Sequence, residues 1–335
     1  MGRPVSLRSS NAKIFIGLLD NPYCTLAPYV RVLNFLGSES SRDWLDEAIG
    51  SLSNLPAVHE LLIQNFVWGR LNSATITSLS TAFQTLIHLE IRAAQFDSVN
   101  DLIQLLSSKP LLQSFSVDDL AWDDPLFDNT LSIPKGLHSL HLSNCYKRDI
   151  LDALLDSVPP IKHMQLGSVY PEDTYSIGRF LRRLGSHLLT LQLEFSSLDA
   201  GGDAEDFCSR VDLAHNTALH TLVLDKFINY SAYQFSSAVG WIPELLSQTL
   251  NIRELSFGVA IRHLGELHPP DDPIDWVALD RLFCDPKFPH LRTLRFWISG
   301  ILTLETVSVA IGNCLPRSKE KGMLNFHRGT PRINI

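Results

Sequence analysis

One apolar pattern recurs along almost the whole chain and constrains its fold more than any other feature. The pattern is apolar-x-x-apolar-x-apolar, and ten copies follow one another in order. Their apolar positions are Val30/Leu33/Phe35, Val58/Leu61/Ile63, Leu86/Leu89/Ile91, Leu112/Phe115/Val117, Leu137/Leu140/Leu142, Ile161/Met164/Leu166, Leu188/Leu191/Leu193, Leu219/Leu222/Leu224, Ile252/Leu255/Phe257 and Leu291/Leu294/Phe296. Successive copies begin 28, 28, 26, 25, 24, 27, 31, 33 and 39 residues apart. This regular period indicates a stack of similar units.

Each copy is expected to form a β-strand, because its fourth and sixth positions alternate with the period of a strand and face one core. Between the strands, apolar residues recur at spacings of three and four, which predicts helices. Examples are residues 44–52, 99–106, 150–158 and 276–283. One unit cannot bury its apolar face alone, whereas stacked neighbours can. We therefore predict an α/β solenoid of about ten strand–helix repeats, with a parallel sheet on its concave face.

The similarity between the copies extends beyond the sixth position of the pattern. Residues 137–145 fit the leucine-rich pattern L-x-x-L-x-L-x-x-N/C, with Cys145 at position nine. Position nine is apolar in most other copies, and position eleven is Trp68, Phe96, Trp122, Leu198 or Ile301 in five of them. Because position eleven normally faces inward, we expect its aromatic side chains to pack in the core rather than form a binding stripe. The expected fold is a leucine-rich-repeat horseshoe.

These residues resemble the leucine-rich-repeat region of F-box proteins, especially the large, divergent set found in mushroom-forming (basidiomycete) fungi. Residues 24–30, 288–294 and 314–317 are also similar to that set. The resemblance implies a substrate receptor of a cullin–RING ubiquitin ligase, in which the F-box binds the ligase adaptor. Residues 1–29 read as an N-terminal arm and capping helix, residues 30–315 as the repeat domain and residues 316–335 as a C-terminal tail. The chain is thus expected to lack an F-box, and the adaptor is a partner only if one is present upstream.

Composition narrows the classes of partner and compartment. The 335 residues are 45 % hydrophobic, which is enough to line one elongated domain. The formal net charge is −8, so we expect no nucleic-acid binding. No apolar run approaches the ~18 residues of a membrane helix, so we expect no membrane span. The five cysteines are far apart and never in C-x-x-C spacing, which favours reduced thiols in the cytoplasm or nucleus.

The candidate site is the row of side chains that point outward from the predicted strands. Fold constraints leave these positions free, and they combine acids, amides and a few large groups, as protein-recognition surfaces do. Trp and Arg are enriched at the energetic centres of interfaces, which singles out Arg295 and Trp297. The residues predicted for the protein-binding face are Glu90, Arg92, Ser116, Asp118, His141, Gln165, Gln192, Glu194, Asp225, Arg295 and Trp297.

No motif of catalysis, cofactor binding or metal binding is present in the sequence. His263 and His268 lie five residues apart, which does not place them on one helix face. Cys145 is expected to pack at its turn rather than act as a nucleophile. We therefore predict a protein-interaction scaffold without cofactors. The alternative is a degenerate or structural repeat protein with no ligase role, and an enzyme is much less favoured.

Overall fold

The computed structural model describes residues 4–37, 44–124, 132–195, 200–229, 241–249, 251–268 and 274–331, with only the backbone given for residues 200–203. The chain divides into two compact units, Met1–Pro160 and Ile161–Ile335. Each unit is an α/β arrangement in which strands alternate with helices along the sequence.

The sheet of the first unit is parallel, and its strands are adjacent in the order in which they occur in the chain. The strands are β1 (Val5–Leu7), β2 (Val32–Leu36), β3 (Glu60–Gln64), β4 (His88–Ser98), β5 (Ser114–Asp124) and β6 (Ser139–Cys145). The helices are α1 (Ala12–Leu19), α2 (Trp44–Leu52), α3 (Ser73–Thr81), α4 (Val99–Ser107) and α5 (Lys147–Leu154), with short 3₁₀ turns at η1 (Ala27–Tyr29) and η2 (Trp68–Arg70).

The second unit repeats this plan with a parallel sheet in sequence order. Its strands are β7 (His163–Leu166), β8 (Thr190–Glu194), β9 (Thr221–Asn229), β10 (Glu254–Ile261), β11 (Thr293–Gly300) and β12 (Leu324–Arg328). Its helices are α6 (Thr174–Leu184), α7 (Ala200–Arg210), α8 (Trp241–Ser247), α9 (Trp276–Phe283), α10 (Leu304–Cys314) and α11 (Pro316–Glu320), with 3₁₀ turns at η3 (Pro171–Asp173), η4 (Gly185–His187) and η5 (Leu264–Leu267).

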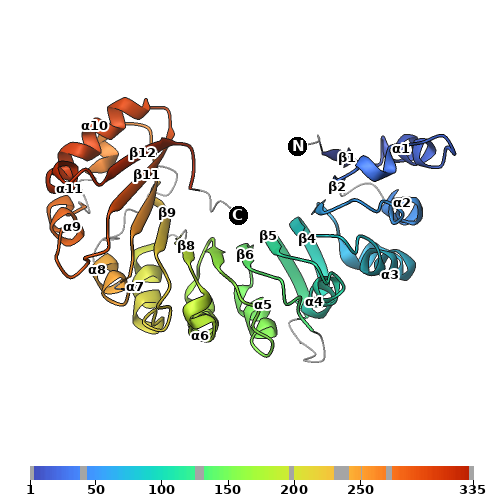
Figure 1. Cartoon of the computed structure of the whole chain (residues 1–335), viewed down its shortest axis with the longest axis horizontal. Helices are drawn as coiled ribbons and strands as arrows, with labels where there is room; N and C mark the ends of the chain where they lie inside the picture. Colours follow the sequence, from blue (N-terminus) through green and yellow to red (C-terminus); the bar gives the residue numbers. More distant parts are fainter. Residues whose placement is uncertain are drawn as a thin grey trace. The chain divides into compact units, whose positions relative to one another are not determined.

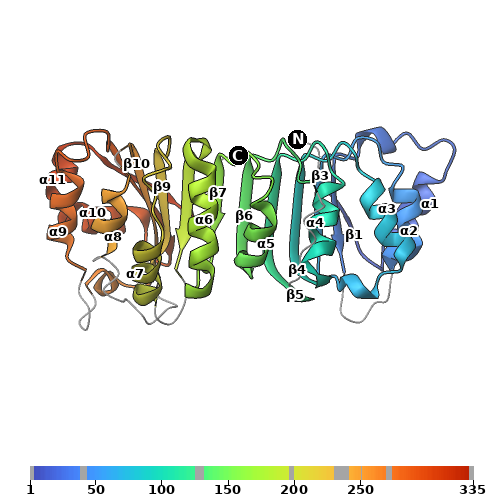
Figure 2. The same cartoon turned by 90° about the horizontal axis from the view of Figure 1, so that it is seen from below.

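In each unit the helices cover one face of the sheet and leave the other without a helix (Figures 1 and 2). We call the latter the helix-free face. The ten predicted strands are confirmed as β2 to β11, and their parallel order confirms a repeating strand–helix plan. The sheets also include β1 and β12, which pair with β2 and β11. In the described part of the chain, no helix is both long and apolar enough to cross a bilayer.

The apolar positions of the pattern form the core between sheet and helices. In β6, Leu140 is 1 % exposed and Leu142 is fully buried, whereas the intervening His141 is half-buried. The first position of every copy is buried as well, from Val30 to Leu291. The predicted direction of the strand side chains is therefore confirmed.

A left-handed backbone recurs at position eight, just after the apolar strand residues. The residues concerned are Asn65, Ala93, Asp119, Asn144, Ser168 and Lys226, with φ between 46° and 59°. Asn and Asp tolerate this conformation best among residues other than glycine. Between β4 and β5 the pairing omits Ala93 and Asp119 but keeps its register, because Arg92 pairs with Asp118 and Ala94 with Leu120. The left-handed residue reverses the alternation, so position nine faces the core, where Cys145 is 8 % exposed.

A buried lysine after α4 forms hydrogen bonds to the end of the helix in the preceding repeat. Lys109, which follows α4, is 1 % exposed and donates from Nζ to the carbonyls of Leu79, Ser80 and Ala82 at 2.5, 2.9 and 2.7 Å. These carbonyls lie at the C-terminal end of α3, where helical bonding leaves them without intrahelical donors. A buried side chain thus ties one repeat to the next.

The aromatic residues at position eleven are core residues, as expected. Trp68 and Phe96 are 3 % and 1 % exposed, and their rings stack at 4.7 Å. Trp122 is buried and donates from Nε1 to Asp149 at 2.9 Å. Ile301 differs and is 78 % exposed, because β11 ends at Gly300 and the chain turns away before α10. All five cysteines are free thiols.

Candidate functional site

The outward side chains form two rows across the helix-free face of each unit. In the first unit, register places Asn34, Leu62, Glu90, Ser116 and His141 in one row and Leu36, Gln64, Arg92, Asp118 and Ser143 in the next. In the second unit, one row contains Gln165, Gln192, Val223, Ser256, Arg295 and Asn325, and the next contains Glu194 and Asp225 together with Gly258, Trp297 and His327. All eleven residues predicted for the binding face lie on these rows.

In the first unit, the predicted residues pair with one another along and across strands. Arg92 forms an ion pair with Glu90 two residues earlier on β4, with Nη2 and Nε at 2.5 and 2.7 Å from Glu90 Oε1. Ser116 Oγ lies 3.0 Å from His141 Nδ1 on the next strand. These groups lie at the surface or are half-buried, so they remain available to a molecule that covers the face.

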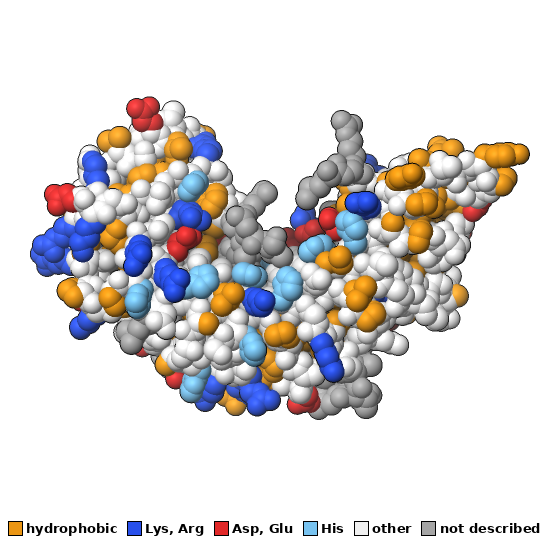
Figure 3. Space-filling model, viewed as in Figure 1, with side chains coloured by type: hydrophobic (Ala, Val, Ile, Leu, Met, Phe, Trp, Pro, Cys, Tyr) orange, Lys and Arg blue, Asp and Glu red, His pale blue; other side chains and the backbone are white. Residues whose placement is uncertain are grey.

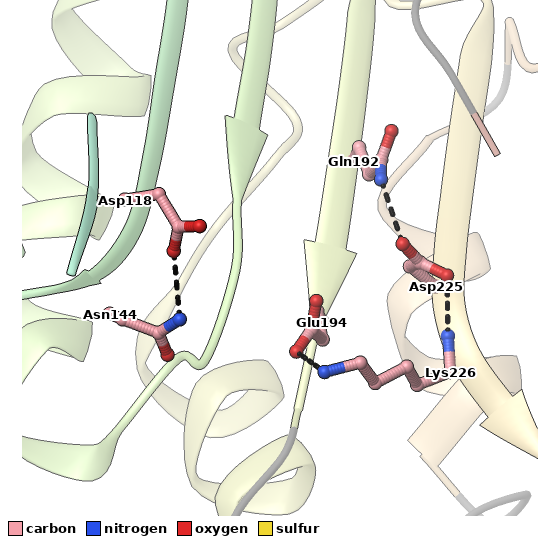
Figure 4. Close-up of polar contacts among 6 residues, drawn as sticks. All are labelled: Asp118, Asn144, Gln192, Glu194, Asp225 and Lys226. Carbon is pink, nitrogen blue, oxygen red and sulfur yellow. Dashed lines mark hydrogen bonds and ion pairs between the residues drawn. The ribbon is translucent and has the colours of Figure 1, made fainter. Parts of the chain in front are cut away.

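Asp118 accepts a hydrogen bond from a residue that was not among those predicted from the sequence. Its carboxylate accepts a hydrogen bond from Asn144 Nδ2 at 2.9 Å, across from β5 to the end of β6 (Figure 4). Asn144 lies at position eight, with φ of 47°. An asparagine at that position was the signal available in the sequence, because asparagine favours the left-handed conformation.

In the second unit, Asp225 on β9 is the centre of a polar cluster (Figure 4). Its Oδ2 accepts a hydrogen bond from Gln192 Nε2 on β8 at 3.1 Å, and its Oδ1 accepts one from the backbone N–H of Lys226 at 2.8 Å. Lys226 Nζ reaches back across to Glu194 Oε1 on β8 at 2.5 Å. The cluster therefore joins three predicted residues, Gln192, Glu194 and Asp225, to one that sequence reasoning missed.

Burial sets the electrostatics of this cluster. Gln192 and Glu194 are 1 % and 8 % exposed although they point to the helix-free face. Loss of hydration raises the pKa of the Asp225 carboxyl, and the nearby Glu194 carboxylate raises it further. The Lys226 N–H, the Lys226 charge and the Gln192 amide oppose that rise because they favour the ionised form.

Gly258 lets the Asp225 carboxylate approach β10. A Cβ atom at position 258 would lie 2.4 Å from Asp225 Oδ1 and 2.8 Å from the backbone nitrogen of Lys226. Both contacts are shorter than atoms tolerate, so a larger residue would displace the carboxylate, the backbone beside it, or both. Glycine at this position is thus required by the geometry of the cluster.

Gly258→Ala is expected to lower the pKa of Asp225. The displaced carboxylate would regain hydration, which favours its charged form. An NMR titration of the aspartate side chains measures this shift directly. Gly50→Ala is the matched control, because a Cβ atom there meets nothing within 4 Å. An Asp225 pKa that is the same in both variants would contradict the proposed contact.

Arg295 and Trp297 on β11 are both partly covered by neighbouring side chains. Arg295 Nη1 pairs with Glu254 Oε1 on β10 at 3.0 Å. The Trp297 ring stacks on His327 of β12, with ring centroids 4.9 Å apart. Trp297 is therefore half-buried and keeps only part of its surface for a partner.

Among the described residues of the outward rows, two side chains have a buried polar atom without a hydrogen-bond partner. The atoms are Gln192 Oε1 and Arg295 Nε. Buried polar groups are normally paired, and each unpaired one lowers stability. Both belong to the same outward row of the second unit, where a molecule that covers the face can supply a donor to Gln192 Oε1 and an acceptor to Arg295 Nε.

The residues considered for metal or nucleophilic chemistry do not converge. His263 pairs with Glu266 at 3.4 Å, whereas His268 Nε2 lies 3.6 Å from Cys314 Sγ. Among the described residues, no group of three or more His, Cys, Asp or Glu side chains is arranged to hold a metal ion. Residues 269–273, which follow His268, lie outside the described part of the chain.

No protein-family model matches this sequence, and no curated protein matches it.

Proposed function

We propose that the chain is a leucine-rich-repeat solenoid that binds a protein partner through its helix-free face, which would be the concave face of a horseshoe. The observation that carries this proposal is the chemistry of the outward rows. Their polar side chains pair with one another, as Glu90 does with Arg92 and Asp225 with Gln192, instead of serving the apolar core. Surfaces of mixed polarity with few fold constraints suit protein recognition.

The resemblance to F-box proteins supports a narrower version of this proposal. The chain would then be the substrate-recognition part of a ubiquitin-ligase receptor in the cytoplasm or nucleus, and the cullin–RING adaptor would bind through an F-box. The other candidates are a degenerate or structural repeat protein and, less favoured, an enzyme. The five free cysteines are in keeping with a reducing compartment.

Affinity purification of the protein from cells of the organism that produces it, followed by mass spectrometry of the bound proteins, tests binding through the helix-free face. We expect the double variant Glu90→Lys/Asp118→Lys to lose at least tenfold of the main partner, because reversed charges at an interface repel a matched surface. The control Asp20→Lys/Glu305→Lys makes the same change in net charge at exposed positions away from that face.

Two outcomes would oppose the proposal in different ways. Equal recovery of every partner by both double variants would exclude the helix-free face of the first unit as the binding surface. The full-length natural protein could instead recover stable partners that include no cullin-complex subunit. That result would exclude the ligase role and leave the binding role intact.

A further inference from the structure

A row of basic residues lies along the edge of the second unit where its strands begin. Its members are Lys162, His220, Arg253 and Arg292, each immediately after the first apolar position of its repeat. We call these four residues the basic row. Leu189 is the residue at the same position in the repeat between Lys162 and His220.

Backbone hydrogen bonds show that these positions are neighbours in space. The N–H of Leu189 donates to the Lys162 carbonyl at 2.8 Å, and the N–H of His220 donates to the Leu189 carbonyl at 3.1 Å. Arg253 bonds in the same way to His220 at 2.8 Å, and Arg292 to Arg253 at 2.9 Å. Parallel strands lie about 4.8 Å apart, so the row spans roughly 19 Å.

The charges of the row are exposed and uncompensated. Lys162, Arg253 and Arg292 are exposed, and within the described part of the chain none of them forms an ion pair. Glu254, which directly follows Arg253 in the chain, forms its ion pair with Arg295 instead, with Oε1 3.0 Å from Arg295 Nη1. Like charges on neighbouring strands destabilise a sheet, so the charges of the row do not stabilise the fold.

The basic row stands out because the chain as a whole is acidic, with a net charge of −8. Figure 3 looks onto the edge where the strands begin, and there blue Lys and Arg side chains and pale blue His side chains gather while red ones are sparse. The repeat position that carries the row is also basic in part of the first unit, at Arg31, His59 and His138. Lys, Arg or His therefore occupies this position in seven of the ten repeats.

We propose that the basic row of the second unit binds an acidic segment of a partner protein, at an edge distinct from the helix-free face. Arginine side chains bind carboxylates in a planar, two-bonded geometry. Arg253 and Arg292 lie immediately before the adjacent strands β10 and β11. An extended peptide rises about 3.3 Å per residue, so roughly six residues would cover the row. Three permanent cations in an acidic chain make a weak electrostatic footprint for nucleic acid, which favours the carboxylate ligand.

Fluorescence anisotropy with a labelled peptide of about eight alternating Glu and Ser residues, enough to span the row at ~3.3 Å per residue, tests this proposal on the full chain. We expect Arg253→Glu/Arg292→Glu to weaken binding at least tenfold. The matched control is Arg182→Glu/Arg183→Glu, which changes the net charge equally at exposed positions of α6. Circular dichroism of both variants checks that they keep the native fold.

A conservative variant tests the role assigned to the guanidinium groups. Arg253→Lys/Arg292→Lys keeps the charge but loses the two-bonded geometry, so we expect an intermediate affinity. Addition of about 0.2 M NaCl should weaken binding of the wild type, because exposed charges are screened. Equal loss in the two Glu variants would show a general charge effect and overturn the proposal. Absence of peptide binding, or tighter row-dependent binding of single-stranded DNA, would overturn it as well.

Discussion

Leu140→Ala is expected to destabilise the protein by about 2–5 kcal/mol, because it removes a buried side chain and leaves a cavity. Leu140 is 1 % exposed and lies on β6 opposite Phe115 of β5. The surrounding core is built from similar apolar positions of adjacent repeats, so the space cannot close without moving a neighbouring strand or helix. The free energy of unfolding from urea titrations, followed by circular dichroism, measures the loss.

Leu62→Ala is the matched control, since it makes the same truncation at an outward position. Leu62 is half-buried on the helix-free face of β3, and we expect its replacement to cost less than about 1 kcal/mol. The contrast between the two leucines is the sharpest test of the register. Similar losses at both positions would show that the two faces of the sheet are not distinguished as described.

The ten central strands could be predicted because two independent periods agree in the sequence. Residues alternate within each copy with the period of a strand, and the copies recur at the length of one strand–helix unit. The end strands β1 and β12 were not predicted. Val5 and Leu7 carry only part of the six-residue pattern, and Leu324 and Phe326 do likewise. Short strands of this kind form because an adjacent sheet edge offers hydrogen bonds, which no local pattern reports.

The direction of the candidate site residues was predictable, but their partners were not. Alternation alone places Asp225 and Glu194 on the outward side of their strands. The link between them depends on Lys226, whose φ of 48° turns its side chain back to Glu194. Lysine has no preference for that conformation, so nothing in the sequence indicated it. Gly258 is also required only because another strand's carboxylate lies against it.

Lys109 shows most clearly where sequence reasoning ends. Lysine is rarely buried, and a lysine after a helix is ordinarily read as a solvated residue. Here the side chain is buried because three carbonyls of the preceding repeat lie within reach of its three protons. Those carbonyls come from α3 and the residue that follows it, about 30 residues earlier in the chain. The contact is a property of the stack and has no local signature.

Lys109→Met is expected to destabilise the protein by about 2–4 kcal/mol at pH 7, because buried carbonyls lose their donors. The methionine side chain fills similar space but cannot donate. Ser80 keeps a weak contact from Gln84 Nε2 at 3.5 Å, whereas Leu79 and Ala82 have no other side-chain donor among the described contacts. Urea denaturation of both proteins gives the difference. Lys135→Met is the control at an exposed lysine, and we expect it to change stability by less than about 0.5 kcal/mol.

The loss caused by Lys109→Met should grow with pH. Burial lowers the pKa of Lys109 from its usual 10.5 to about 8 in the folded protein. Between those values the unfolded chain binds more protons than the folded one, so the wild type gains stability as pH rises. The cost of burying the charge is complete below pH 8 and disappears above pH 10.5. Methionine does not titrate, so the difference between the proteins should increase by about 2 kcal/mol from pH 7 to pH 9.5. A difference that stays constant would show that the folded protein keeps Lys109 charged throughout, with the three carbonyls outweighing its loss of hydration.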